Sequence, residues 1–211
     1  MCEQLFDYIK EHSEREPLYL QQIARRAHVR LLHGRMVSGA LQGRLLKMLA
    51  ELLQPQNVLE IGTFVGYSAL CLAEGAPQNA VIHTVEIDDE LEDIIRENFS
   101  SVDFGKKIVL HIDDALQTIK NLKNTRFDLV FIDGDKRDYM KYYKAVLPVV
   151  RSGGVILADN TLWNGKIFEN VQHNDYQTKA ILEFNDFLAN DSRVEKIILP
   201  LRDGLTLIKK I

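Results

Sequence analysis

Short β-branched segments alternate with amphipathic, helix-like segments through the middle of the chain, and this alternation limits the possible folds more than any other feature. The β-branched segments are residues 57–61, 81–87, 107–112, 127–133 and 154–159. Helix-like segments begin between them near Ser68, Asp88, Ala115 and Tyr139. Two parallel strands need a long crossover, which a helix supplies, so this order of segments is typical of βαβ units. It predicts a parallel sheet with helices on both faces.

The two ends of the chain add helices before this pattern and strands after it. Helical periodicity extends to about Leu53, and a further helix is expected within residues 180–191. Two final strand-like segments, 194–200 and 204–211, have too short a connection for a crossover helix, so the last strand should run antiparallel to its neighbour. We therefore predict an α/β fold with a doubly wound, mostly parallel seven-stranded sheet, an antiparallel C-terminal strand and N-terminal helices. Residues 1–211 would form one domain, with 1–35 as a helical extension.

Length, charge and cysteine content narrow the class of protein. A chain of 211 residues is long enough for one domain with a sizeable core. Its formal net charge of −4 argues against a surface that is basic throughout, as in a dedicated nucleic-acid binder. The two cysteines, Cys2 and Cys71, form neither a disulfide framework nor a zinc spacing. The sequence also has no signal peptide and no apolar stretch that would cross a membrane, so we expect a cytoplasmic protein without a membrane partner.

Oxygen-bearing side chains stand at the carboxyl ends of the predicted parallel strands. They are Glu60, Glu86, Asp113, Asp114, Asp133, Asp135, Asp159 and Asn160. Any one of them is more often a loop or capping residue, and Asp114 is as well suited to cap the helix that begins at Ala115 as to contact a cofactor. Open parallel sheets bind their ligands at this edge, however. Their shared position therefore indicates a binding site.

The loop after the first predicted strand contains two glycines, Gly62 and Gly66, separated by bulky residues that include Phe64. Phosphate-binding loops of nicotinamide enzymes use more closely spaced glycines, so a pyrophosphate is disfavoured here. Glu86 ends the second strand, where an acid accepts the hydroxyls of a ribose. These features indicate an adenosine ligand without pyrophosphate. S-adenosylmethionine fits, with its carboxylate near a helix N-terminus and its ammonium near an acid, and the candidate partners are Ser68, Glu60 and Asp133.

Four motifs stand in order along the chain: VLEIGTFVGYSAL, FDLVFIDGDKRDYMKYY, GGVILADNTLWNG and LPLRDGLTL. Together they resemble the cation-dependent O-methyltransferase family that includes caffeoyl-coenzyme A and catechol O-methyltransferases. The resemblance extends from about Met36 to the C-terminus. It implies a Rossmann-like fold, S-adenosylmethionine as the methyl donor, Mg²⁺ or another hard divalent cation such as Mn²⁺ or Ca²⁺, and a homodimer.

The resemblance also implies roles for individual residues. The metal ligands would be Asp133, Asp159 and Asn160, and the general base beside the methyl acceptor would be Lys136. The cofactor contacts would be Ser38, Glu60, Gly62, Ser68, Glu86 and Ala115. A substrate contact would be Asn164. We add candidates from their positions in the motifs: for the cofactor Phe64, Asp114 and Asp133, and for the acceptor Trp163 and Arg202.

The proposed ligands suit one kind of chemistry. Two carboxylates and an amide carbonyl form an all-oxygen site of the type that hard divalent cations occupy. Asp135 is the alternative to Asp133, which is preferred because it directly ends its strand. A bound cation lowers the pKa of a hydroxyl that it contacts, and Lys136 is placed to remove the proton as a neutral amine. The expected reaction is transfer of a methyl group to a metal-bound hydroxyl of a catechol-like small molecule.

Some residues depart from the family's usual pattern and bear on the acceptor. Gln42 and Arg44 flank a glycine where the family often has an acid and a glutamine, and Arg202 stands where a small residue is commoner. Residues 24–35 hold four arginines, two histidines and no acid. This basic stretch is either a solvated or dimer-forming helix face or a phosphate-binding patch. Because some bacterial relatives methylate 5-hydroxyuridine in transfer RNA, tRNA is the alternative acceptor. A non-catalytic module that binds S-adenosylmethionine is a remote alternative, since Lys136 and all three ligand candidates are present.

Overall fold

The computed structural model describes residues 3–211, except for the side chains of residues 3, 6 and 35. Met1 and Cys2 lie outside the described residues, so the interpretation of Cys2 is not tested. The chain begins with the predicted helices, α1 (Glu3–Glu11), α2 (Leu18–Arg30) and α3 (Ala40–Leu53). No helix in the described part of the chain is long and apolar enough to span a membrane.

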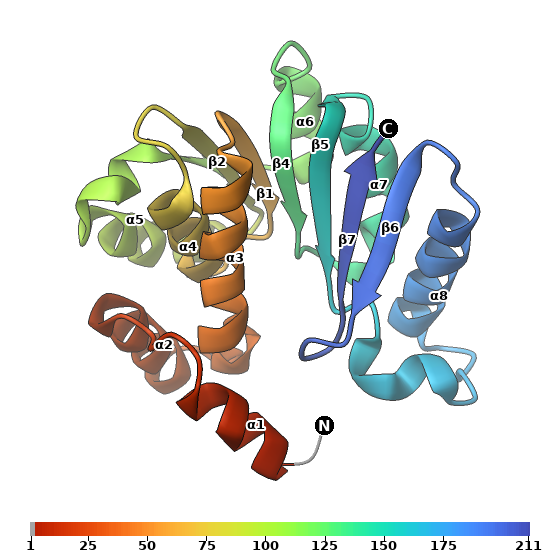
Figure 1. Ribbon diagram of the computed structural model, residues 1–211, viewed down its shortest axis with the longest axis horizontal. Coiled ribbons are helices and arrows are strands. Elements are labelled where there is room, and N and C mark those ends of the chain that lie inside the picture. The colour runs from red at the N-terminus through yellow and green to blue at the C-terminus, as the bar shows by residue number, and fades with distance from the viewer. Residues whose placement is uncertain (1–2) are drawn as a thin grey trace.

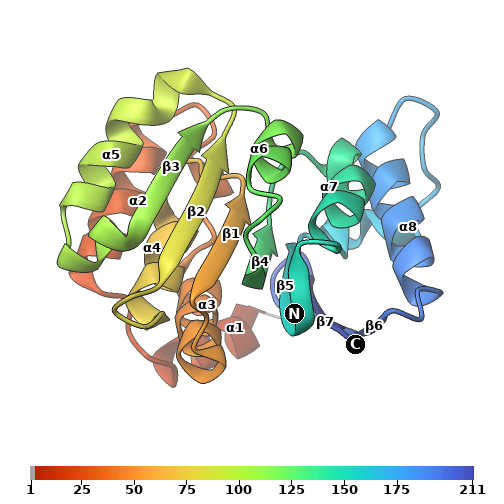
Figure 2. The same cartoon turned by 90° about the horizontal axis from the view of Figure 1, so that it is seen from above.

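Seven strands form one sheet in the order β3-β2-β1-β4-β5-β7-β6 (Figures 1 and 2). Their bounds are β1 (Asn57–Ile61), β2 (Val81–Glu86), β3 (Ile108–Ile112), β4 (Phe127–Ile132), β5 (Val150–Asp159), β6 (Val194–Leu199) and β7 (Leu205–Lys210). Strands β1 to β5 pair in parallel, and β7 runs antiparallel between β5 and β6. The predicted sheet is confirmed. Its order reverses between β1 and β4, where the carboxyl ends of the strands leave a crevice.

Helices cover both faces of the sheet because its central strands are apolar on both sides. The helices after α3 are α4 (Tyr67–Gly75), α5 (Glu92–Ser100), α6 (Ala115–Asn121), α7 (Tyr139–Val146) and α8 (Tyr176–Ala189). One core joins the sheet to α2, α3, α4 and α5, with Leu20, Leu46 and Leu70 fully buried. The other joins it to α6, α7 and α8, with Tyr143 and Phe184 fully buried. Figure 2 shows these two groups of helices on opposite sides of the sheet.

Three elements begin four residues away from the sequence prediction, and one of them is α8, which begins at Tyr176 rather than at residue 180. β5 begins at Val150 rather than at residue 154, although the chain passes through Gly153 with a φ of 74°. Its pairing with β4 passes from Phe127 opposite Val150 to Leu129 opposite Val155, so residues 151–154 form an irregularity between two paired segments. The helix expected from Asp88 starts at Glu92, because Asp88 instead caps a 3₁₀ turn by accepting a hydrogen bond from the backbone N–H of Glu90.

Candidate active site

The carboxyl ends of β1, β2, β4 and β5 open into one large cavity of about 1300 Å³. Residues 31–34 and 36–38, between α2 and α3, form the opposite wall, and the β6–β7 hairpin contributes Arg202 and Asp203. A single small ligand typically occupies about 300–1,000 Å³. The cavity therefore has room for a cofactor and a second molecule side by side, at the switch point where such sheets bind ligands.

The loop after β1 approaches β4 so closely that it requires a glycine. Gly62 has a φ of 96°, and a Cβ atom added to it would lie 2.4 Å from the backbone oxygen of Asp133. Its N–H donates to the backbone oxygen of Val85 at 3.0 Å. The loop is thereby held against β2 and β4, and its next residues face the cavity.

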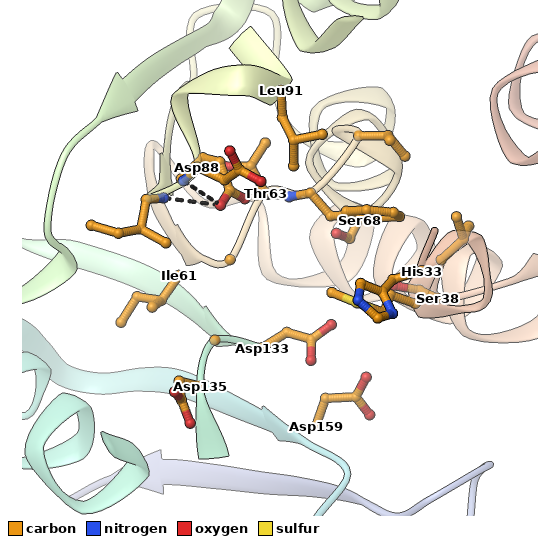
Figure 3. A pocket seen from close by; sticks show the side chains of 18 of the residues that line it. His33, Ser38, Ile61, Thr63, Ser68, Asp88, Leu91, Asp133, Asp135 and Asp159 are labelled. Carbon is orange, nitrogen blue, oxygen red and sulfur yellow. Dashed lines mark hydrogen bonds between the residues drawn. The ribbon is translucent and has the colours of Figure 1, made fainter. Parts of the chain in front are cut away.

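Glu86 is fixed at the cavity wall by backbone amides. Its Oε2 accepts a hydrogen bond from the N–H of Phe64 at 2.7 Å, and its Oε1 accepts from those of Ile87 at 2.9 Å and Asp88 at 3.0 Å (Figure 3). Oε1 already accepts two hydrogen bonds, but Oε2 has a second lone pair, so Glu86 still has acceptor capacity for a ligand. The sequence placed Glu86 in the cofactor site, and the structure brings it beside Phe64 in the cavity lining.

Glu60 lies beneath the cavity and does not line it. The side chain is fully buried, its Oε2 accepts a 2.5 Å hydrogen bond from the hydroxyl of Thr84, and its Oε1 has no partner in the described structure. Burial raises the pKa of Glu60 to about 8. An uncompensated carboxylate oxygen at this depth is costly unless a proton or a cationic ligand satisfies it.

Lys136 links the ends of β4 and β5. Its Nζ donates to Oδ1 of Asp133 at 2.8 Å and to the hydroxyl of Tyr139 at 2.7 Å. The Tyr139 hydroxyl lies 3.1 Å from the backbone oxygen of Ile132 and 3.0 Å from that of Asp159, the last residues of the two strands. The lysine is 8% exposed and therefore has few alternative positions. The network holds the ammonium group at a defined place on the cavity wall.

Asp159 and Asn160 follow β5 in a tight turn. Asp159 is 3% exposed; its Oδ2 accepts a hydrogen bond from Nε2 of Gln42 at 2.7 Å, and its Oδ1 accepts from the backbone N–H of Asn160 at 2.8 Å. Burial and the nearby charge of Asp133 raise the pKa of Asp159 to about 6. Asn160 has a φ of 56°, and its Nδ2 faces Oδ2 of Asp203 at 3.5 Å.

The side chains of Asp133 and Asp159 point into the same part of the cavity, with His33 and Ser38 on the opposite side (Figure 3). Asp135 also lines the cavity, but Arg137 engages both oxygens of its carboxylate through Nε at 3.0 and 2.9 Å. Lys136 engages only Oδ1 of Asp133, which favours Asp133 as the ligand. Among the described residues, no group of three or more His, Cys, Asp or Glu side chains is arranged to hold a metal. A cation site here would need the amide oxygen of Asn160 as its third protein ligand.

The structure brings most of the predicted site residues to this cavity. The lining residues among them are Ser38, Gly62, Phe64, Ser68, Glu86, Asp114, Ala115, Asp133, Lys136, Asp159, Asn160, Trp163 and Arg202. Asp114 lines the cavity and also caps α6, because it accepts a hydrogen bond from the N–H of Gln117 at 2.9 Å. Asn164 is exposed and does not line the cavity: it lies in a turn where Trp163, Asn164 and Gly165 all have positive φ, and this turn leaves its side chain outside.

Sequence reasoning missed two residues that hold the site together. Gln42 was noted only as a departure from a family pattern, and its contact with Asp159 spans 117 residues of sequence. Tyr139 was expected only as the start of a helix, since nothing in DYMKYY distinguishes its hydroxyl from those of Tyr142 and Tyr143. The exposed His28 and His33 also line the cavity, on the side formed by the basic stretch.

Comparisons with known proteins agree with this geometry. A family model described as O-methyltransferase matches residues 10–211. A caffeoyl-CoA O-methyltransferase of Eucalyptus gunnii is 34% identical over 218 residues, which cover 98% of this chain and 87% of the relative. The structure of a Bacillus cereus O-methyltransferase in complex with SAH has a TM-score of 0.89 at 25% identity, covering 99% of this chain and 97% of the other.

A second solved relative is a Streptomyces achromogenes O-methyltransferase involved in tomaymycin synthesis, in complex with SAM. Its structure has a TM-score of 0.88 at 28% identity, and the match covers 100% of this chain and 99% of the other. The match of the family model extends over both halves of the sheet and over every strand end that lines the cavity. The chain therefore belongs to the O-methyltransferase family.

Proposed function

We propose that the protein is an S-adenosylmethionine-dependent, divalent-metal-dependent enzyme that methylates a hydroxyl group of a catechol-like small molecule. The observation that carries the proposal is a pair of carboxylates, Asp133 and Asp159, that point into one cavity from neighbouring parallel strands with Lys136 beside them. Their mutual repulsion and burial raise the pKa of Asp159. Lys136 pairs directly with Asp133 only, and a divalent cation would supply further positive charge between the two carboxylates.

S-adenosylmethionine as methyl donor is supported by the bound SAM and SAH of the solved relatives. In this chain, Glu86 offers acceptor capacity for a ribose hydroxyl at the cavity wall, whereas the buried Glu60 does not reach the cavity. Ser68 lies at the N-terminus of α4, where a carboxylate is favoured. We assign the cofactor to this half of the cavity, with the remaining contacts from Ser38, Gly62, Phe64, Asp114, Ala115 and Asp133.

The donor atoms at the strand ends fit a hard divalent cation such as Mg²⁺, Mn²⁺ or Ca²⁺. Asp133, Asp159 and Asn160 present oxygen ligands, and neither histidine nor cysteine is among them. Such a cation, when bound, would lower the pKa of an acceptor hydroxyl and orient it. Gln42 limits the rotation of the Asp159 carboxylate, as residues behind metal ligands commonly do.

In its neutral amine form, Lys136 is placed to receive the proton of the acceptor hydroxyl at Nζ. Two of the three hydrogen-bonding directions of this nitrogen are used by Asp133 and Tyr139, which leaves the third for the acceptor. Trp163 supplies an aromatic surface on the acceptor side of the same cavity. Holding the acceptor oxygen in line with the sulfonium methyl group would account for much of the rate acceleration.

Transfer RNA is the second candidate acceptor, and the placement of the basic stretch favours it. His28 and His33 line the cavity, and the neighbouring Arg25 and Arg30 are exposed. Arg26 is less available, because its guanidinium pairs with Glu97 at 2.6 Å and with Asn98. Cations along the rim would contact the phosphates of a strand whose base enters the cavity.

A methyl-transfer assay with two acceptor classes separates these candidates. Catechols form one set, and tRNA carrying 5-hydroxyuridine forms the other. We expect transfer to catechols that is unchanged in the Arg25→Gln and Arg30→Gln variants. Transfer to tRNA alone, falling steeply with salt and in both variants, would replace the small-molecule acceptor with tRNA. Transfer to neither would leave a non-catalytic binding role.

We also propose a homodimer formed through the N-terminal helices. The apolar side chains of Leu5 and Tyr8 on α1, and of Leu18 and Val29 on α2, are exposed. Apolar surface of this kind is commonly covered by a partner. Light scattering after size-exclusion chromatography would give twice the chain mass of 24.2 kDa, and the mass of a monomer would contradict the proposal.

A further inference from the structure

Arg202 occupies a fixed position at the cavity rim because the tip of the β6–β7 hairpin is packed against the turn after β5. Leu162 donates its N–H to the backbone oxygen of Asp203 at 2.7 Å, and Thr161 donates to that of Gly204 at 3.0 Å. Gly204 has a φ of 90°, and a Cβ atom there would lie 2.5 Å from Leu162. The backbone that carries Arg202 is therefore held in register with Asp159 and Asn160.

The guanidinium of Arg202 reaches across the cavity rim to the segment before α3. Its Nη1 donates to the backbone oxygen of Val37 at 3.2 Å and would lie 3.6 Å from a Cβ atom on Gly39. Figure 1 shows the hairpin at the same end of the molecule as the beginning of α3. Val37 and Ser38 line the same cavity. The guanidinium thus lies between the cofactor side and the acceptor side of the site.

Arg202 has no carboxylate partner among the described residues. The other cationic groups near the strand ends are paired, Lys136 with Asp133 and Arg137 with Asp135. The acid next to Arg202 in the sequence, Asp203, faces the side chain of Asn160 instead. A guanidinium has five N–H donors, and only one hydrogen bond to it is formed here. An arginine in this state is prepared to bind a planar anion.

Arg202 places a positive charge at the rim of a cavity whose other charged side chains are mostly negative. Most of the charged residues that line the cavity are acids, including Asp113, Asp114, Asp138 and Asp159. An anionic acceptor is repelled by such a lining unless a cation meets its charge. If the two hydroxyls of a catechol reach the strand ends, the far side of the ring faces the rim, where Arg202 lies.

We propose that Arg202 is a specificity-determining residue that binds a carboxylate carried directly on the catechol ring of the acceptor, as in dihydroxybenzoates. This inference rests on the proposed O-methyltransferase function and narrows its acceptor class. A charge-assisted, bidentate contact of this kind favours the acid over a neutral analogue by roughly 10- to 100-fold.

The test compares 3,4-dihydroxybenzoate with 3,4-dihydroxybenzamide, which has the same shape and no charge. For the wild-type enzyme we expect kcat/KM to be at least about tenfold higher for the acid. Arg202→Gln should remove this preference through a higher KM for the acid and leave the amide within about threefold of wild type. Arg202→Lys should restore part of the preference. The control is Arg126→Gln, which removes the same charge from an exposed arginine outside the cavity and should change neither substrate.

Calorimetric binding of both compounds to the SAH-loaded protein gives a second readout that does not require turnover. Tighter binding of the acid that depends on Arg202, without methyl transfer to any catechol, would support the anion site and overturn the proposed function. Equal kcat/KM values for acid and amide in the wild type would overturn the inference and leave the proposed function intact. Equal decreases in kcat/KM for both compounds in Arg202→Gln would also overturn the inference, because they would show that Arg202 acts only by holding Val37.

Discussion

Tyr139→Phe removes one hydroxyl group from the centre of the site and leaves the shape of the core unchanged. Tyr139 is fully buried, and its hydroxyl contacts Nζ of Lys136 at 2.7 Å and the backbone oxygens of Ile132 and Asp159 at 3.1 and 3.0 Å. The hydroxyl has one hydrogen, so it donates to one carbonyl at a time while it accepts from the lysine. Without it, Lys136 keeps only Asp133, and the ends of β4 and β5 lose the group that bridges them.

The expected loss follows from these contacts. A neutral hydrogen bond contributes about 1 kcal/mol and one to a charged group about 1.5–3 kcal/mol, but Lys136 retains its second partner, so we expect a fall in the free energy of unfolding of about 2–3 kcal/mol. For a domain of this length, this corresponds to a fall in Tm of roughly 4–12 °C. The sheet itself should be unchanged, because the aromatic ring still fills its place beside Phe184.

Urea denaturation followed by circular dichroism measures this difference, and Tyr142→Phe is the matched control. Tyr142 lies three residues later on α7, and its hydroxyl makes no hydrogen bond within the described structure. Its loss should change stability by less than about 0.5 kcal/mol. Equal stabilities of the two variants would refute the assigned hydrogen-bond network.

Three further predictions concern other buried polar groups. Burial raises the pKa of Glu60 from 4.5 to about 8, so the folded protein keeps a proton that the unfolded chain releases. The free energy of unfolding should therefore fall as the pH rises through this range. Urea titrations at about pH 5 and pH 9 measure this fall, and Glu60→Gln should remove it. Gln42→Leu should weaken Mn²⁺ binding to the cofactor-free protein by roughly tenfold in calorimetric titrations, because Asp159 loses a 2.7 Å hydrogen bond; unchanged affinity would contradict this role. Arg44 is buried and pairs with Glu74 at 2.6 Å, so Arg44→Met should lower the free energy of unfolding by about 3 kcal/mol. Adding Glu74→Gln should recover most of this loss. Equal stabilities of the single and double variants would argue against the pair.

The sheet was predictable because its signal is local. Each parallel strand is a short apolar segment followed by a helix, and β1 begins and ends where the sequence pattern indicates. The first residues of β5 were not predictable in this way. Ser152, Gly153 and Gly154 resemble a turn, and the pairing of β5 with β4 skips them, because it passes from Val150 opposite Phe127 to Val155 opposite Leu129.

The candidate site likewise has residues that a local sequence signal predicts and residues that only tertiary packing brings in. Asp133 and Asp159 were expected together because the carboxyl ends of neighbouring parallel strands meet at one edge of the sheet. The contact of Gln42 with Asp159 and the hydroxyl contacts of Tyr139 arise from tertiary packing, which no local pattern encodes. Asn164 follows the expected ligands in sequence and yet stays outside the cavity, because consecutive positive φ angles redirect the chain.

Methyl transfer before and after metal removal tests the central claim most directly. The measurement follows transfer from S-adenosylmethionine to 3,4-dihydroxybenzoate by the wild-type protein and by Asp159→Ala, first with chelator and then with excess Mg²⁺. We predict that chelation abolishes transfer by the wild type, that Mg²⁺ restores it, and that Asp159→Ala stays inactive under both conditions while it still binds SAH. Transfer that survives both chelation and the Asp159→Ala substitution would rule out a metal-dependent reaction at Asp133 and Asp159.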